Sequence, residues 1–220
     1  MQEIKDMVCP FCGCLCDDVT LEIENGTIVS TDNCCTIGNA KFMGKNRLKN
    51  PIKKVDGSWV DITYDEAVNT AVDILLDADR PLLYGWSGTH GEAQCVGVHM
   101  NEILGGVIDN TSCVCHGPSI LAIQEVGHPG CTLGQVKNRA DLIIYWGCNP
   151  IEAHPRHMSR YTTYADGYFL DNAFRNRKVI VVDVRETETA KVADEFIRIK
   201  QGGDYAVLSA LRAIIRGIGD

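Results

Sequence analysis

Cysteine is the residue type in this chain whose spacing most directly indicates chemistry. Six of the 11 cysteines lie within the first 35 residues, and three of them form the pattern C-x2-C-x3-C at Cys9, Cys12 and Cys16. Cys35 follows as a fourth, and Gly38 stands where the chain is expected to turn away from a metal. Four thiolates on one segment can hold a cubane iron–sulfur cluster. The sequence therefore predicts a [4Fe-4S] cluster bound by Cys9, Cys12, Cys16 and Cys35.

Other interpretations of these cysteines stay open. Cys14 can replace Cys12 in the pattern, and Cys34 can replace Cys35. A structural zinc site is a second possibility, although such sites usually pair two C-x2-C knuckles, and adjacent Cys34 and Cys35 make a poor second knuckle. A disulfide framework is disfavoured because the first residues show no secretory signal and the number of thiols is odd. We therefore expect a cytoplasmic protein.

A second candidate thiol lies in the segment SCVCHGPS, residues 112–119. Pro118 suits the first turn of a helix, so Cys115 and His116 are expected just before a helix amino terminus. The helix dipole and the neighbouring imidazole both favour a thiolate there, which makes Cys115 a candidate nucleophile or metal ligand. The alternative is an inert buried cysteine. We interpret four other cysteines in this way: Cys95, Cys113, Cys131 and Cys148. We likewise expect a structural role for four histidines: His90, His99, His128 and His157.

The elements that must position these residues form an α/β pattern. Residues 1–50 are expected to make a small β-rich iron–sulfur domain, with a hairpin that turns at Asn25 and Gly26. Residues 51–220 are expected to form a Rossmann-like region with a parallel sheet, preceded by a connector at 47–61. Within it we predict helices at 64–79 (capped by Thr63), 92–104, from 118 and after 203, and strands at 81–86, 141–146, 178–183 and 196–199.

Three strand ends in this pattern are candidate ligand sites. They are the glycine loop 85–91, the turn 147–150, and the pair Asp183 and Arg185, which suits a base edge and a phosphate. Each has an ordinary alternative, since turns also need glycine and an exposed Asp–Arg pair is often a surface ion pair. Placed together on one edge of one sheet, as we expect, they favour a dinucleotide-like ligand.

Charge and hydropathy exclude two kinds of partner. The net charge of −8 and the pI near 5.2 argue against a nucleic-acid partner, because phosphate binding requires a basic surface. No apolar run approaches the roughly 18 residues that span a bilayer, so no membrane span is expected.

Taken together, these motifs resemble those of the molybdenum- or tungsten-bis(pyranopterin guanine dinucleotide) oxidoreductases, which include formate dehydrogenases. The amino-terminal cysteines, V-C-H-G-P-S at 114–119, W-G-C-N-P at 146–150 and V-D-V-R at 182–185 carry this resemblance. A closer similarity, to the catalytic B subunits of formylmethanofuran dehydrogenases, rests on residues 137–142, 153–161, 183–190, 193–194 and 201–204.

The resemblance implies a role for each matching residue. Cys9, Cys12, Cys16 and Cys35 would hold the cluster, Cys115 would bind tungsten or molybdenum beside two pterins, and His116 would orient substrate or move a proton. The guanine nucleotide end of one pterin would be held by Gly147, Asn149, Asp183, Arg185, Gln201 and Asp204. Related formate dehydrogenases often place a lysine two residues after the fourth cysteine, where this chain has Ile37, and the nearest lysine is Lys41. The family's catalytic polypeptide is roughly twice this long, so its active-site arginine and much of the second pterin site are expected in a further C-terminal half.

The implied function is reduction of carbon dioxide to formate, which a partner protein of the complex then condenses with methanofuran in methanogenesis. The implied partners are an amidohydrolase-like A subunit, C and D subunits, ferredoxin-like iron–sulfur subunits and a low-potential donor such as ferredoxin. Three alternatives are a formate dehydrogenase, a non-catalytic electron-transfer module in which Cys115 is structural, and a zinc-stabilised structural protein.

Overall fold

The computed structural model describes residues 1–86, 91–170 and 176–218 of the chain. By their internal contacts they form two units, which we describe separately. The first unit comprises Met1–Lys45 together with Cys131–Asp220, and the second comprises Asn46–Gly130. The prediction of α/β structure with parallel sheets is confirmed, since each unit contains a parallel pair of strands.

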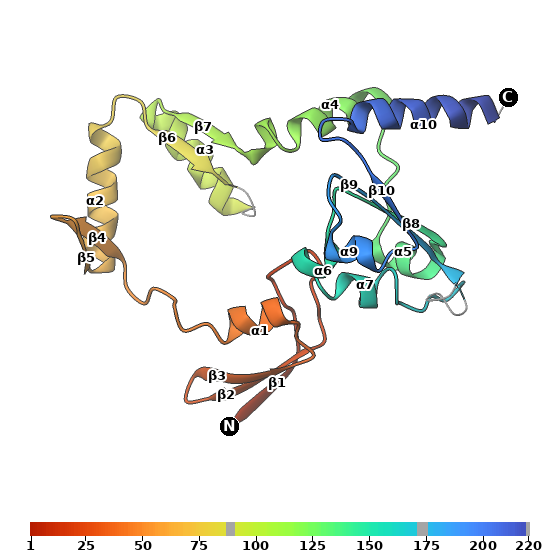
Figure 1. Ribbon diagram of the computed structural model, residues 1–220. Coiled ribbons are helices and arrows are strands. Elements are labelled where there is room, and N and C mark those ends of the chain that lie inside the picture. The colour runs from red at the N-terminus through yellow and green to blue at the C-terminus, as the bar shows by residue number, and fades with distance from the viewer. Residues whose placement is uncertain (87–90, 171–175, 219–220) are drawn as a thin grey trace. The chain divides into compact units, whose positions relative to one another are not determined.

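The amino-terminal part of the first unit is a small antiparallel sheet (Figure 1). Strands β1 (Gln2–Met7), β2 (Val19–Glu24) and β3 (Thr27–Asp32) lie in the order β1-β2-β3. Asn25 and Gly26 join β2 to β3 with φ of 49° and 74°, which confirms the predicted hairpin turn. Helix α1 (Thr36–Phe42) follows, and the buried side of this sheet packs against cysteines of the loop between β1 and β2.

The rest of the first unit surrounds a three-stranded parallel sheet in the order β10-β9-β8. Its apolar face combines Ile143, Tyr145, Val179 and Val181 with Met158 and Ala190 from two short helices. The opposite face carries Leu142 and Ile144, which are about half exposed. The elements are α5 (Leu133–Arg139), β8 (Leu142–Trp146), α6 (Pro150–Ala153), α7 (His157–Arg160), β9 (Lys178–Asp183), α9 (Glu188–Lys191), β10 (Glu195–Arg198) and α10 (Asp204–Ile218).

A buried arginine holds the loops around this sheet. The guanidinium of Arg177 donates hydrogen bonds to the carbonyls of Lys137 (2.9 Å), Ala140 (2.7 Å), Ala165 (3.0 Å) and Thr162. Only 4% of Arg177 is exposed, so these carbonyls satisfy a charge that is largely removed from water.

The second unit begins with a hairpin where the sequence predicted a connector. Strands β4 (Ile52–Val55) and β5 (Ser58–Asp61) pair across Asp56 and Gly57, whose φ angles are 48° and 85°. The Asp-Gly pair is a strong hairpin signal, but the alternation of the flanking residues is weak, so the strands were missed. Helix α2 (Tyr64–Asp77) follows, and the Thr63 hydroxyl accepts a hydrogen bond from the Glu66 amide as its cap predicts.

The second unit then forms a parallel pair of strands, β6 (Leu82–Gly85) and β7 (Val107–Asn110), joined by α3 (Glu92–Leu104). A 3-10 turn, η1 (Thr111–Cys113), and α4 (Gly117–Val126) complete it. Two expectations are wrong here. Leu82 and Tyr84 are about 60% exposed, so β6 is not a buried strand, and β6 pairs with β7 rather than joining the β8–β10 sheet.

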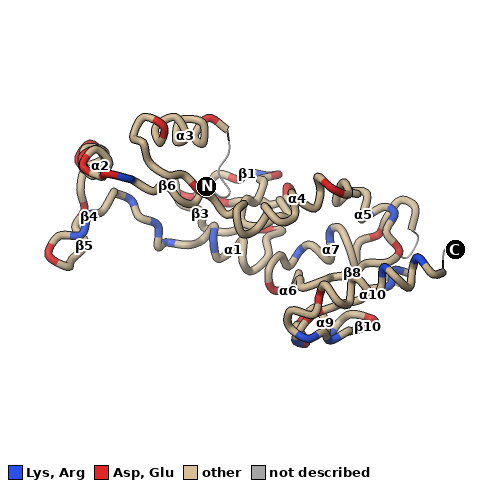
Figure 2. The backbone as a smooth tube through the Cα atoms, turned by 90° about the horizontal axis from the view of Figure 1, so that it is seen from above, with Lys and Arg blue, Asp and Glu red and all other residues tan. Residues whose placement is uncertain are grey.

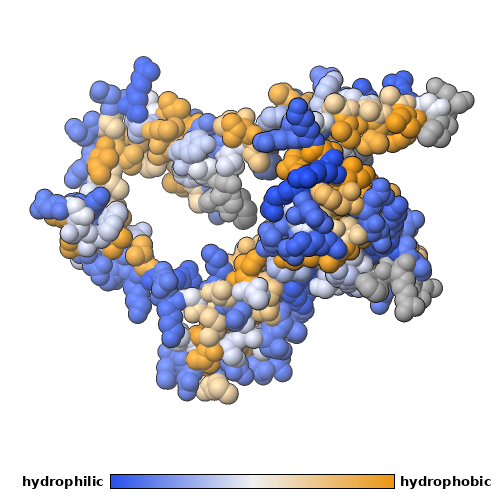
Figure 3. Space-filling model, in the orientation of Figure 1, coloured by the Kyte–Doolittle hydropathy of each residue, from blue (hydrophilic) through white to orange (hydrophobic). Residues whose placement is uncertain are grey.

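The distribution of charged and apolar residues agrees with the composition of the chain. Figure 2 shows acidic and basic residues interspersed along the chain. Among the described residues, no helix is long and apolar enough to cross a membrane. Helix α10 carries an apolar face, visible as the orange band along it in Figure 3, formed by the exposed side chains of Leu208, Leu211, Ile214 and Ile215.

Candidate functional site

The six amino-terminal cysteines surround one small cavity in the first unit. All six line it: Cys9, Cys12, Cys14, Cys16, Cys34 and Cys35. Three are buried and three are partly buried, and every one is a free thiol. Burial and neighbouring thiols raise the pKa of Cys14 to about 12, and burial is also the main cause of the raised pKa of Cys34. Six sulfur atoms thus line one cavity, beside Val19, Asn33 and Arg156, and thiols are the donors that an iron–sulfur cluster uses.

Short backbone contacts hold the first three predicted ligands in place. The Cys9 amide donates to the Cys16 carbonyl at 2.7 Å, and the Leu15 amide donates to the Cys12 carbonyl at 3.3 Å. Leu15 has a φ of 43°, a conformation that costs free energy for a side chain of this kind and that keeps the loop tight. The loop thus presents Cys9, Cys12 and Cys16 to the same cavity.

The fourth predicted ligand, Cys35, caps helix α1, and its sulfur accepts a hydrogen bond from the Gly38 amide at 3.4 Å. Gly38 itself lies within α1, so the chain does not turn away there as expected. A Cβ at this position would lie 2.5 Å from the sulfur of Cys34 and 3.4 Å from that of Cys9. Gly38 is therefore needed for the close approach of thiols, and the choice between Cys34 and Cys35 stays open.

Ion pairs connect the cysteine loop to α7 and the residue before it. Arg156 donates two hydrogen bonds to the Asp18 carboxylate, at 2.7 and 2.6 Å, and a third to the Asn33 carbonyl. Arg160 pairs with Asp17 at 2.6 Å and also with Asp18. Arg156 lines the cysteine cavity, so this network places positive charge beside the thiols.

We expect Asp18→Asn to weaken this connection in a pH-dependent way. The hydrogen bonds from Arg156 lower the pKa of Asp18 in the folded protein. The stabilisation is therefore present above the unfolded pKa of about 4 and is lost as the pH falls through the lower, folded value. In urea denaturation, Asp18→Asn should lower the free energy of unfolding at pH 7, and the difference from the unmodified chain should shrink below about pH 4. A difference that persists unchanged in acid would show that charge is not the cause; exposed Asp32→Asn is the control.

The residues predicted to hold a nucleotide lie along the carboxyl edge of the β8–β10 sheet. Gly147 follows β8 with a φ of 59°, and its amide donates to the Val182 carbonyl of β9 at 2.9 Å. Asp183 ends β9, and its carboxylate accepts the Val184 amide at 2.7 Å. The Trp146 indole donates to Asp204 at 2.7 Å, which fixes the start of α10 beside the end of β8. Five of the six predicted residues come from these strand ends or the start of α10, and Gln201 lies exposed in the turn before α10.

Asn149 offers a hydrogen-bond donor at this edge of the sheet, which suits an acceptor group of a ligand. Its side-chain oxygen accepts from the Thr189 hydroxyl at 2.7 Å, whereas its buried Nδ2 has no hydrogen-bond partner among the described residues. A buried donor without a partner costs free energy, and a ligand oxygen would remove that cost. The third strand end predicted for this edge, the loop 85–91, belongs to the second unit, and residues 87–90, including His90, lie outside the described residues.

Cys115 lies in the second unit, on an exposed loop between η1 and α4. Asn110 accepts the Ser112 amide at 2.7 Å, and the Thr111 carbonyl accepts the Cys115 amide at 2.8 Å, so the loop has a defined path. His116 is the N-cap of α4, which confirms that Cys115 immediately precedes a helix start. The neighbouring Cys113 instead donates to Asp109 at 3.3 Å, and this carboxylate raises the pKa of Cys113.

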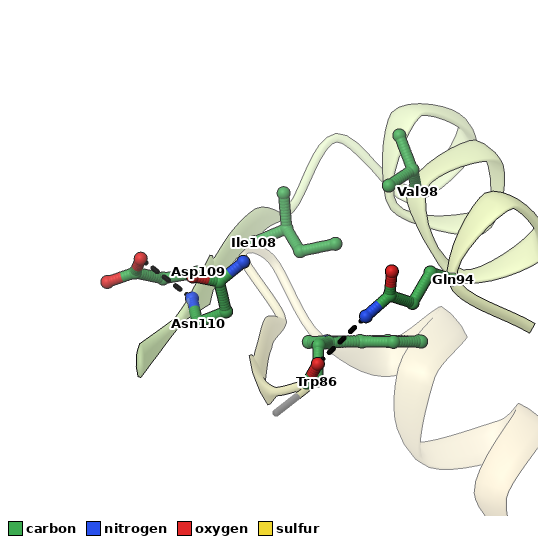
Figure 4. A pocket seen from close by; sticks show the side chains of 6 residues that line it. All are labelled: Trp86, Gln94, Val98, Ile108, Asp109 and Asn110. Carbon is green, nitrogen blue, oxygen red and sulfur yellow. Dashed lines mark hydrogen bonds between the residues drawn. The ribbon is translucent and has the colours of Figure 1, made fainter. Parts of the chain in front are cut away.

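A cavity of about 240 Å³ lies in the same unit, at the carboxyl ends of β6 and β7 (Figure 4). Its lining includes Trp86, whose carbonyl accepts the Gln94 side-chain amide at 2.8 Å, and Asp109 and Asn110 at the end of β7. Sequence reasoning missed β7 and hence these polar residues. The signal was the run Val107–Asn110, which is too short to show periodicity.

Gly97 controls the shape of this cavity. A Cβ at Gly97 would lie 1.9 Å from the Trp86 ring, so Trp86 lies in direct contact with α3 only because residue 97 is glycine. We expect Gly97→Ala to displace the ring and to lower the free energy of unfolding of this unit by about 1–3 kcal/mol. Tryptophan fluorescence and urea denaturation measure both effects. Gly217→Ala in α10, where a Cβ meets nothing within 4 Å, is the control and should be neutral or slightly stabilising. Unchanged emission in Gly97→Ala would contradict this packing.

Comparisons with known proteins agree with these features. The chain is 50% identical, over 97% of its length, to the B subunit of the tungsten-containing formylmethanofuran dehydrogenase 2 of Methanocaldococcus jannaschii. It is 47% identical, over 99% of its length, to the protein of the same name from Methanococcus maripaludis. The chain covers 50% and 51% of these relatives, so it spans about half their length.

A solved structure shares the fold. In the formyltransferase/hydrolase complex from Methylorubrum extorquens with methylofuran, one chain matches with a TM-score of 0.54 and 22% identity, over 70% of this chain and 41% of that one. The model of the molybdopterin oxidoreductase family matches residues 47–218, which is most of the chain. This chain therefore belongs to the molybdopterin oxidoreductase family.

Proposed function

We propose that this chain is the catalytic subunit, or its N-terminal half, of a cytoplasmic formylmethanofuran dehydrogenase that reduces carbon dioxide to formate. The observation that supports this most strongly is the 50% identity to a tungsten-containing enzyme of that name over nearly the whole chain. A formate dehydrogenase is the second candidate, but curated formate dehydrogenases are 24–28% identical to this chain.

In this proposal the cysteine cavity holds a [4Fe-4S] cluster. Cys9, Cys12, Cys16 and Cys35 remain the proposed ligands, and the six thiols that line the cavity fit such a group. The Arg156 guanidinium at the edge of the cavity fits the negative charge that thiolate ligands bring. Related formate dehydrogenases often place a lysine two residues after the fourth cysteine, where this chain has Ile37. In this proposal Arg156 supplies a positive charge beside the cluster instead.

The edge of the β8–β10 sheet holds the guanine nucleotide end of one pterin in this proposal. Asn149 would offer to a ligand oxygen its Nδ2, which has no partner within residues 1–86, 91–170 and 176–218, and Arg185 would offer a guanidinium to a phosphate. Asp183 and Asp204 would accept from donors on the base or ribose. Gly147 and Gln201 complete the proposed set, because both lie in the turns that flank this edge.

Cys115 and His116 carry the chemistry in the second unit. We propose that the exposed Cys115 thiolate binds tungsten or molybdenum, and that His116, beside it at the start of α4, orients substrate or transfers a proton. When bound, the metal–pterin centre would supply the two electrons that, with one proton, convert carbon dioxide to formate. The protein's contribution is to fix the thiolate ahead of a helix amino terminus, where negative charge is stabilised.

Formate would then pass to another protein of the complex for condensation with methanofuran. The proposed partners are the amidohydrolase-like A subunit, the C and D subunits, ferredoxin-like subunits and a ferredoxin-like donor. The exposed apolar face of α10 supports a function in contact with further polypeptide, because such a face is costly in water.

Metal and activity analysis of the purified complex tests this proposal. We expect one tungsten or molybdenum and, beyond the iron of the ferredoxin-like subunits, about four irons for each copy of this chain, together with release of pterin on denaturation and formyl production that requires methanofuran. Iron without pterin would instead identify an electron-transfer module, and an iron-free protein would favour a zinc-stabilised structure. Formate oxidation that is independent of methanofuran would identify a formate dehydrogenase.

A further inference from the structure

Cys14 has a second set of neighbours besides the other amino-terminal thiols. One nitrogen of His154, one nitrogen of His157 and the sulfur of Cys14 all lie within 4.8 Å of one another. Cys14 comes from the loop after β1, whereas the two histidines flank Pro155 and Arg156 between α6 and α7. The Cys14 thiol donates to the His154 carbonyl at 3.8 Å, and the Tyr161 hydroxyl donates to the Cys14 carbonyl at 3.0 Å. Residues more than 130 positions apart are thereby held together.

One atom of this group points to a missing partner. The Nδ1 of His154 is buried and makes no hydrogen bond within the part of the chain that the structure describes. Its other nitrogen, Nε2, lies 3.8 Å from the sulfur of Cys148. Histidines that bind metals commonly use one nitrogen for the metal and the other for a neighbouring side chain. A cation on Nδ1 would remove the cost of an unpaired buried atom.

The surroundings of His157 favour its neutral imidazole, which is the form that binds metals. The His157 ring lies in edge contact with the rings of His154 (4.9 Å between centroids) and Tyr145 (6.3 Å). Burial and the neighbouring His154 lower the pKa of His157. The charged groups nearest in sequence are Glu152, Arg156 and Arg160, and the two arginines are engaged with Asp17 and Asp18.

We propose that Cys14, His154 and His157 form a binding site for a divalent transition metal, zinc by preference, separate from the proposed iron–sulfur cluster. One thiolate and two imidazoles form a ligand set that suits zinc. Zinc bonds of about 2.0–2.3 Å place neighbouring ligand atoms about 3.5 Å apart, so the side chains close inward on binding. The Cys14 proton is released, and the fourth position is left to water. This assignment makes Cys14 a ligand of the second site rather than of the cluster.

Zinc-edge X-ray absorption of the full complex, loaded with zinc, tests this site without interference from iron. The expected spectrum shows about one zinc per chain, bound by one sulfur and by nitrogen or oxygen. Cys14→Ser should remove the sulfur contribution and weaken zinc binding at least about tenfold, while iron content is unchanged. Exposed Cys131→Ser, the matched control, should leave both metals unchanged.

Three results would overturn the proposal. An all-sulfur shell would place zinc among the cluster cysteines. No bound zinc at saturating supply would show that there is no site. Iron loss in Cys14→Ser with intact zinc binding would make Cys14 a cluster ligand. The unmodified complex gives the first two results directly, so they do not depend on whether a variant folds. Absence of the cluster appears as about four fewer irons for each copy of this chain, a readout independent of the zinc shell.

Discussion

Replacing Cys115 by serine should lower carbon dioxide reduction by more than about 100-fold, because loss of a direct metal ligand should exceed the 10–100-fold cost of losing a residue that only supports one. The exposed position of Cys115 before α4 leaves its sulfur free to bind a metal, and a serine hydroxyl is a much poorer ligand for a soft centre. Formyl production by the reconstituted complex measures this effect.

Cys113→Ser is the matched control for this prediction. Cys113 lies two residues away in the same loop, but its thiol contacts Asp109 and the Asn110 carbonyl, so its loss should change turnover little. Iron content should stay the same in both variants. Equal turnover in Cys115→Ser and the unmodified protein would make Cys115 structural and would favour the electron-transfer module.

Replacing Arg177 by leucine should lower the free energy of unfolding by about 3–5 kcal/mol, because four backbone carbonyls lose their donor inside the first unit. Burial lowers the pKa of Arg177, which means that the folded environment disfavours the charged guanidinium. The four hydrogen bonds must offset this desolvation cost. Arg177→Lys should recover part of the loss, since one ammonium cannot reach all four acceptors. Urea denaturation followed by circular dichroism gives these values.

Arg139→Ala provides the comparison for Arg177. Its exposed guanidinium lies 4.2 Å from the centre of the Phe169 ring, a contact that is typically worth about 0.5–1 kcal/mol. If Arg177→Leu and Arg139→Ala lowered the free energy of unfolding equally, the buried hydrogen bonds of Arg177 would not hold the loops around the sheet.

Local signals made much of the fold predictable from the sequence. The Asn25-Gly26 turn and the Thr63 cap each specify a short segment without help from distant residues, and each is confirmed. Strand pairing was harder to predict from the sequence, because it depends on residues far apart in the chain. The assignment of β6 to the β8–β10 sheet was wrong for this reason, and β7 was missed altogether.

In the candidate site, too, local signals were predictable from the sequence and contacts between distant segments were not. Spacing indicated thiols that line the cysteine cavity, and the strand ends indicated the turn 147–150, Asp183 and Arg185 at the carboxyl edge of the β8–β10 sheet. Only the family resemblance implied Gln201 and Asp204. Spacing did not indicate Arg156 at that cavity or the approach of His154 and His157 to Cys14, since these contacts join segments about 140 residues apart. Gly38 was singled out correctly, but for a turn rather than for its contact with the Cys34 sulfur.

Absorption at the tungsten or molybdenum edge, measured on the purified complex with Cys115 and with Cys115→Ser, tests the central proposal most directly. Four sulfurs from two pterin dithiolenes and one from Cys115 should surround the metal in the unmodified complex, and the variant should lose one of the five. An unchanged sulfur shell in the variant, or a complex with neither metal, would contradict the proposal that Cys115 binds the redox metal.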